Sequence, residues 1–254
     1  MKRSHLSGGV LAIILTALGM IPVTLMAQEE EDKPYSFSAG GDLVSSYLWR
    51  GTKFGTGPAI QPYAEFSAGG FAFGGWGSYC FTTNEGAEAD LYASYSFDFG
   101  LSFGITDYYF PGSYKQRLMA DSTIASELDG AEWFDFSKES GSHGIEINVG
   151  YEIKGFSIAA NYMVNEAGGA GTTGGDTYIE LGYSTDHFGV FLGAGNGWYA
   201  VEEEGEDDLF TVCNIGLTAS TEIQITEKFA LPVSGALILN PNTEQFHVVV
   251  GISF

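Results

Sequence analysis

The chain has 254 residues and carries 32 Asp and Glu against 10 Lys and Arg, which gives a formal net charge of −22. Such a charge excludes nucleic-acid binding through phosphate contacts, which require clustered basic side chains. The 36 Gly, 19 Phe and 14 Tyr favour many short strands joined by turns over a helical bundle. We therefore expect an all-β protein with no nucleic-acid partner.

The first 27 residues have the layout of a secretory signal peptide. A basic start precedes the apolar run Val10–Met20, and the small residue Ala27 ends the segment. A membrane-spanning anchor is the alternative, but Gly19 and Pro22 leave fewer uninterrupted apolar residues than the ~20 that a spanning helix needs. We expect cleavage after Ala27 and a mature barrel domain over 28–254.

Strands are predicted throughout the rest of the chain, because apolar side chains alternate with polar or small ones at period two. At the C-terminus, for example, Phe246, Val248 and Val250 alternate with His247 and Val249. One face of each strand suits lipid and the other a polar interior. About twelve strands are expected, over residues 35–50, 58–68, 71–83, 88–98, 100–111, 143–154, 155–165, 176–186, 188–199, 209–225, 229–240 and 245–254.

The connections between these strands alternate in length. Longer polar connections follow the odd-numbered strands, and the longest covers about 112–142. This sorting predicts a transmembrane up-and-down antiparallel β-barrel with periplasmic N- and C-termini and long extracellular loops. A soluble β-sandwich is the alternative, but it gives no reason for sorted loops. Tight turns follow the even-numbered strands, at Gly69-Gly70, Phe99-Gly100, Lys154-Gly155, Asp186-His187 and Thr226–Lys228.

Aromatic residues are expected to form girdles at both ends of the strands, where a membrane meets water. The periplasmic set includes Phe66 and Phe254. The outer set includes Tyr47, Trp49 and Tyr199.

Three segments near the start carry a resemblance to a known family. They are Ser46–Gly51, with the sequence Ser-Tyr-Leu-Trp-Arg-Gly, then Gly57–Pro62 and Gly74–Ser78. In these segments the chain resembles the TorF-type porins, small outer-membrane barrels whose first hairpins carry a Tyr-x-Trp-Arg-Gly pattern followed by a Trp-Gly strand. The stretch Thr211–Phe254 is similar to uncharacterised outer-membrane β-barrels of the Bacteroidetes. The resemblance implies a barrel fold and a bacterial outer-membrane location.

The terminal residue Phe254 resembles the signal by which the outer-membrane assembly machinery recognises its clients. An exposed apolar strand end with an open edge can be captured by strand addition. We expect Phe254 to act as this assembly signal, and to pair with the first strand near Tyr35 when the barrel closes.

Polar side chains on the inward face are candidate pore-lining residues. Acids outnumber bases among them, so a water-filled lumen would favour cations or neutral solutes over anions. The same groups could instead pair with one another and fill a closed lumen. In the long loop, Lys115 and Arg117 could form a constriction, or the loop could cap the barrel from outside. The candidate pore-lining residues are Asp42, Arg50, Gln61, Glu65, Asp90, Glu146, Glu152, Asn161, Glu180, Asn214, Glu222 and His247.

The sequence thus favours a Gram-negative outer-membrane channel for passive diffusion of ions or small polar solutes. Its expected partners are outer-membrane lipid and lipopolysaccharide, the assembly machinery and the solutes. The alternative is a non-conducting structural or adhesive barrel whose outer loops bind a partner.

An outer-membrane hydrolase is less favoured, because no His is placed beside a Ser on the outward face and Asp107 has no evident partner. We expect no enzymatic activity and no cofactor. No metal site is expected either, since Cys80 and Cys213 are predicted on opposite faces.

Overall fold

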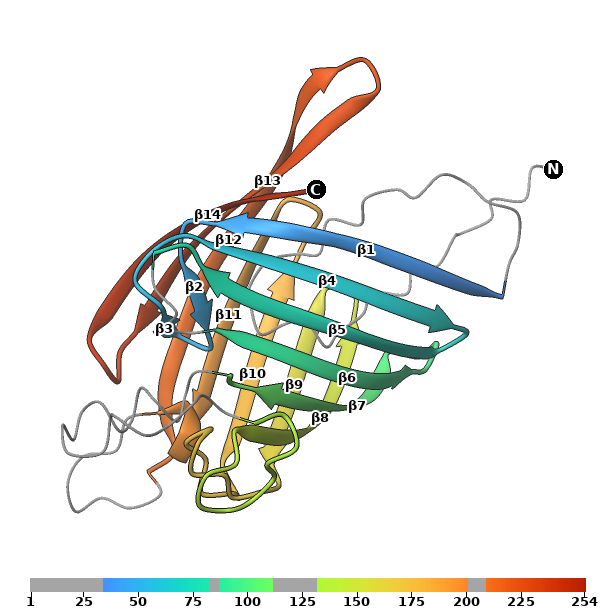
Figure 1. The fold of residues 1–254 in the computed structure, drawn as a ribbon. Coiled ribbons are helices and arrows are strands. Elements are labelled where there is room, and N and C mark those ends of the chain that lie inside the picture. Colours follow the sequence, from blue (N-terminus) through green and yellow to red (C-terminus); the bar gives the residue numbers. More distant parts are fainter. Residues whose placement is uncertain (1–33, 83–86, 112–131, 201–208) are drawn as a thin grey trace.

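The computed structural model describes residues 34–82, 87–111, 132–200 and 209–254, so the expected signal peptide lies outside the described residues. Twelve antiparallel strands form one closed up-and-down barrel (Figure 1), which confirms the prediction of an all-β, up-and-down antiparallel barrel. Among the described residues, no helix is long and apolar enough to cross a membrane. The barrel strands are β1 (Tyr35–Val44), β4 (Ala59–Ala68), β5 (Phe71–Cys80), β6 (Glu88–Ser96), β7 (Leu101–Tyr109), β8 (His143–Ile153), β9 (Phe156–Met163), β10 (Thr177–Ser184), β11 (Phe188–Gly195), β12 (Thr211–Thr226), β13 (Phe229–Asn240) and β14 (Gln245–Ser253).

The period-two alternation of the sequence decides which side chains face outward. Along β8, Ile147 and Val149 are exposed, whereas Glu146 is completely buried. On β14, Val248 and Val250 are exposed around the buried Val249. The barrel therefore carries exposed apolar side chains on its outside and polar side chains on its inside. A surface of this kind is one that lipid or another protein covers.

The tight turns join neighbouring strands at one end of the barrel, as predicted. At Lys154-Gly155 both turn residues have positive φ, 52° and 83°. This is the geometry of a type I′ turn, whose twist matches that of the flanking strands. The longer connections lie at the other end. The connection between β1 and β4 is the first of these.

That first connection corrects the prediction of one strand over 35–50. β1 ends at Val44, and a separate hairpin follows, made of β2 (Tyr47–Trp49) and β3 (Thr52–Phe54). Its turn residues Arg50 and Gly51 have φ of 48° and 84°. The chain therefore reverses where a barrel strand was expected to continue.

The outer aromatic girdle needs a matching correction, because Tyr47 and Trp49 are buried. Tyr199 is buried as well, in the short 3₁₀ segment η2 (Gly197–Tyr199) that follows β11. A packed lumen can exclude water from an aromatic side chain as well as lipid can. The side chains of Tyr47, Trp49 and Tyr199 lie in the lumen.

The barrel closes between β1 and β14. The two strands pair over Asp42–Val44, and Phe254 continues the ladder by exchanging backbone hydrogen bonds of 2.9 and 3.0 Å with Gly41. The predicted position of Phe254 beside Tyr35 is wrong. β14 is too short to reach that residue, which pairs only with Ala68 of β4 among the described residues.

The end of the β12–β13 hairpin extends past the C-terminus and out of the barrel (Figure 1). We call residues 220–232 the projecting hairpin. Its ladder continues to the pair Thr226 and Phe229, but β14 accompanies β13 only from Val233 onward. Its side chains between Thr221 and Phe229 are exposed.

Candidate functional site

The hairpin between β1 and β4 folds into the barrel rather than over its rim. We call Tyr47–Phe54 the internal hairpin. The exposed fractions of Tyr47, Leu48, Trp49 and Arg50 are only 2%, 2%, 4% and 7%. Since the barrel wall already forms a closed sheet without these residues, their burial places them in the lumen.

Strands on all sides of the lumen contact the internal hairpin. Tyr47 packs on Trp76 of β5 and donates a hydrogen bond to Glu88 of β6, and Trp49 packs on Tyr108 of β7. Arg50 contacts Glu146 of β8 and Tyr178 of β10. The carbonyl oxygen of Gly51 accepts a hydrogen bond from Asn240 of β13. The internal hairpin therefore crosses the lumen instead of lining one wall.

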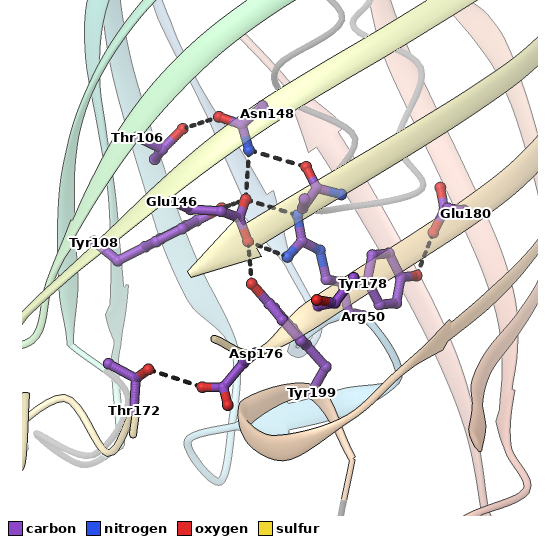
Figure 2. A network of polar contacts seen from close by, with 12 residues as sticks. Arg50, Thr106, Tyr108, Glu146, Asn148, Thr172, Asp176, Tyr178, Glu180 and Tyr199 are labelled. Atoms are coloured by element: carbon purple, nitrogen blue, oxygen red, sulfur yellow. Dashed lines mark hydrogen bonds and ion pairs between the residues drawn. The ribbon is translucent and has the colours of Figure 1, made fainter. Parts of the chain in front are cut away.

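An ion pair between Arg50 and Glu146 lies at the centre of these contacts (Figure 2). Arg50 donates from Nη1 to Oε2 at 2.5 Å and from Nη2 to Oε1 at 3.0 Å. Glu146 also accepts hydrogen bonds from the Tyr199 hydroxyl at 2.5 Å, the Tyr108 hydroxyl at 3.1 Å and the Asn148 amide at 2.5 Å. A bidentate pair with further donors is the arrangement that best compensates a buried carboxylate.

Aromatic rings enclose the guanidinium group of Arg50. Its Cζ atom lies 4.5 Å from the ring centroid of Tyr178, 4.6 Å from that of Trp49 and 5.0 Å from that of Tyr199. These are cation–π distances. Burial alone would lower the pKa of Arg50, but the Glu146 carboxylate holds that pKa well above its usual value. Arg50 therefore stays charged inside the barrel.

The same side of the lumen holds a second group of hydrogen bonds. The Tyr178 hydroxyl donates to Glu180 at 2.5 Å and accepts from the Asn214 amide at 2.9 Å. The Asn148 amide, which also bonds Glu146, donates to Asn161 at 2.9 Å. Side chains of β8, β9, β10 and β12 are thereby linked to the internal hairpin.

The structure brings together only part of the predicted pore-lining set. Arg50, Glu146, Asn161, Glu180 and Asn214 belong to the linked hydrogen bonds above. The other members that take a buried or half-buried position are Gln61, Asp90, Asp42, Glu65, Glu152 and His247.

Glu222 is exposed, because it lies on the projecting hairpin rather than in the barrel wall. Lys115 and Arg117 lie outside the described residues. The internal hairpin enters the lumen, which was not predicted.

Sequence reasoning missed Tyr47, Trp49, Tyr108 and Tyr199 as site residues. A signal was present around Arg50, the one arginine in the predicted pore-lining set. It stands between Trp49 and Gly51. A lone buried cation needs an acid partner and tends to stack on aromatic rings.

Asp107 has a partner that was not foreseen. His143 approaches Asp107 Oδ1 through Nδ1 at 2.9 Å, and its Nε2 lies 2.7 Å from the carbonyl oxygen of Trp133. The His143 ring is completely buried and stacks on Phe136 and Tyr109. Both nitrogens face acceptors, so the ring offers no free base to solvent. The cluster instead fastens residues 132–142 to β7 and β8.

Comparison with known proteins adds one match. Residues 28–230 match the sequence model of the Gcw_chp family, which is described as a bacterial protein of unknown function. The matched range contains the internal hairpin and both partners of the Arg50 and Glu146 ion pair. No curated protein matches the chain. The chain therefore belongs to the Gcw_chp family of bacterial proteins of unknown function.

Proposed function

We propose that this protein is an outer-membrane channel for small cations or small polar solutes, with the internal hairpin as its constriction. The observation that carries the proposal is the distribution of side chains on the barrel wall. Exposed apolar side chains cover the outside, and polar side chains line the inside. An apolar exterior suits lipid, and a polar interior suits water and solutes. The resemblance of the first hairpins to TorF-type porins supports the same assignment.

The charge of the lumen supports a preference for cations. Arg50 is neutralised by Glu146. Asp42, Glu65 and Glu180 are half-buried, and among the described residues their side chains accept hydrogen bonds from hydroxyl and amide groups. Acids in a confined space with low-dielectric walls concentrate negative potential, which attracts cations and repels anions.

The internal hairpin limits the width of the passage. A barrel of about twelve strands falls between small barrels that side chains fill and the wide water-filled porins. A hairpin across such a lumen leaves room beside it for small solutes only. We therefore expect a small conductance for the wild-type protein.

Planar-bilayer recordings test the proposal. The key variant replaces Tyr47–Phe54 by eight Gly and Ser residues, and it should conduct several times more than the wild type. Glu152→Gln together with Glu180→Gln should weaken the cation preference, whereas Glu222→Gln on the projecting hairpin should leave it unchanged. The altered gel migration of unheated protein reports whether each variant has folded. A folded variant without the internal hairpin that stays silent at all voltages would exclude a channel.

A closed structural or adhesive barrel is the second candidate. The full set of donors around Glu146 favours it, because a completely satisfied buried network holds its members in one arrangement. In that case the outer loops would bind the partner. Silent recordings from both the wild type and the variant without the internal hairpin would support this function.

A further inference from the structure

Two acids on β6 lie buried beside the internal hairpin. Glu88 and Asp90 are two residues apart and therefore on the same face of the strand, and both are almost completely buried. Their carboxyl groups are within hydrogen-bonding reach of each other. Tyr47 donates a hydrogen bond to Glu88 Oε2 at 2.7 Å. In the described part of the chain, neither acid forms an ion pair with Lys or Arg.

Glu146, the other buried acid discussed above, has many more hydrogen-bond donors than Glu88 and Asp90. That carboxylate has Arg50 and three further donors. Glu88 and Asp90 share the Tyr47 hydroxyl and a hydrogen bond from the Tyr109 backbone. When both groups are ionised, two buried carboxylates with so few donors carry negative charge that the described residues do not balance.

A buried amide group lies beside Ser78, the neighbour of Glu88 across the sheet. Gln61 is completely buried, and its Nε2 donates to Ser78 Oγ at 3.2 Å. Ser78 lies directly opposite Glu88 in the pairing of β5 with β6. The Gln61 amide group, Ser78 and Glu88 therefore follow one another across the neighbouring strands β4, β5 and β6. Within the described residues, neither Gln61 Oε1 nor Asp90 Oδ1 has a hydrogen-bond partner.

We propose that Glu88, Asp90 and Gln61 bind one divalent cation, Ca²⁺, inside the barrel, with the Ser78 hydroxyl as a further oxygen ligand. The available donors are all oxygen atoms, which hard cations prefer, and two carboxylates match a double positive charge. Ca²⁺ also tolerates the irregular geometry of a mixed carboxylate, amide and hydroxyl set.

The cation would have two acid ligands rather than three. The described residues contain no group of three or more His, Cys, Asp or Glu side chains suited to a metal ion, so Gln61 and Ser78 supply the remaining protein oxygens. Because Tyr47 bonds Glu88, a bound cation also ties the internal hairpin to β6. The site goes beyond the proposed channel, since a closed barrel could hold it equally well.

Calorimetric titration of CaCl₂ into chelator-treated full-length protein in detergent tests the site. The wild type should bind one Ca²⁺ per barrel. Glu88→Gln and Asp90→Asn should each weaken binding by about tenfold or more, and the double variant should abolish it. Glu222→Gln is the matched control, because it removes an exposed acid, and its affinity should equal that of the wild type.

A second probe locates the bound ion. Tb³⁺ takes Ca²⁺ sites and emits when nearby aromatic rings are excited, and the Tyr47 and Trp76 rings lie 5.5 Å apart beside this site. The emission should be displaced by Ca²⁺ and lost in the double variant. Equal binding by the wild type and the folded double variant would overturn the site. So would a wild type that binds no Ca²⁺, in which case the two acids share a proton.

One further variant tests the site even if the variants of Glu88 and Asp90 do not fold. Gln61→Met keeps both carboxylates and the side-chain volume but removes the amide oxygen. It should weaken Ca²⁺ binding by about threefold or more while the gel migration stays that of a folded barrel. An unchanged affinity in this variant would remove Gln61 from the site and overturn the proposal as stated.

Discussion

The internal hairpin and the projecting hairpin lie on opposite sides of the barrel wall, one in the lumen and the other outside. The internal hairpin turns at Arg50-Gly51 and disappears into the lumen, whereas the projecting hairpin turns at Glu227-Lys228 and leaves the barrel. The internal hairpin carries a cation matched to the buried Glu146, together with rings that pack on several strands. The projecting hairpin has little beyond its own ladder. Side-chain partners therefore decide which hairpin becomes part of the core.

Removing the charge of Arg50 should give one of the two largest effects, together with the loss of the buried Trp49 ring. Arg50→Met keeps most of the side-chain volume but leaves Glu146 buried without its cation. The loss of one partner from a buried ion pair costs about 3–5 kcal/mol of folding stability. Urea unfolding in detergent, followed by tryptophan fluorescence, measures the change.

The partner variant and a control sharpen this prediction. Arg50→Met combined with Glu146→Gln should recover part of the loss, because neither charge remains unpaired. Lys228→Met, which removes a charge from the projecting hairpin, should stay within about 0.5 kcal/mol of the wild type. Wild-type stability in Arg50→Met would mean that the ion pair does not anchor the internal hairpin.

Two glycines with positive φ should respond differently to the same change. At Gly51 (φ 84°) a Cβ atom would collide with the carbonyl oxygen of Cys213, whereas at Gly69 (φ 58°) nothing lies within 4 Å. Gly69→Ala should cost about 1–2 kcal/mol for the left-handed backbone alone. Gly51→Ala should cost clearly more, because a backbone carbonyl in a barrel strand cannot move aside cheaply. Equal losses in urea unfolding would show that the internal hairpin is free to shift.

The same contrast explains what could be predicted from the sequence. Period-two alternation and turn residues are local signals, so the strands around Ile147 or Val248 and the turn at Lys154-Gly155 were predicted correctly. The segment Tyr47–Trp49 alternates in the same way whether its rings face lipid or lumen. Its direction is decided by Glu146, which is 96 residues away from Arg50 in the chain. No local pattern contains that information.

The candidate site was predictable to a similar extent. The inward positions of Glu146 and Asn161 followed from alternation, but their partners did not. The pairing of Asp107 with His143 spans 36 residues and depends on where the long loop returns to the barrel. Glu222 was placed in the lumen by its alternation, although its strand continues past the barrel end.

The seam between β1 and β14 should be less sensitive than the internal hairpin. Deleting Phe254 removes its two backbone hydrogen bonds with Gly41, each of which contributes about 0.5–1.5 kcal/mol. Unaided refolding into detergent should therefore lose about 1–3 kcal/mol of stability. The measurement is the fraction of protein that shows folded gel migration along a urea series.

A conservative variant separates the seam from the proposed assembly signal. Phe254→Leu keeps both backbone hydrogen bonds and changes only the side chain. It should refold unaided as the wild type does, but assemble more slowly in cells if the aromatic ring is the signal. Normal assembly of Phe254→Leu in cells would remove Phe254 from that role.

The smallest effect is expected on the projecting hairpin. Ile225→Ser replaces an exposed side chain, so little apolar contact is lost and stability in detergent should change by no more than about 0.5 kcal/mol. Trp49→Ala, in contrast, empties a buried position and should cost about 3–5 kcal/mol. Both are measured by urea unfolding. If Ile225→Ser proves neutral in detergent but destabilising in lipid vesicles, the projecting hairpin is covered by the bilayer, and the barrel sits deeper in the membrane than its closed wall requires.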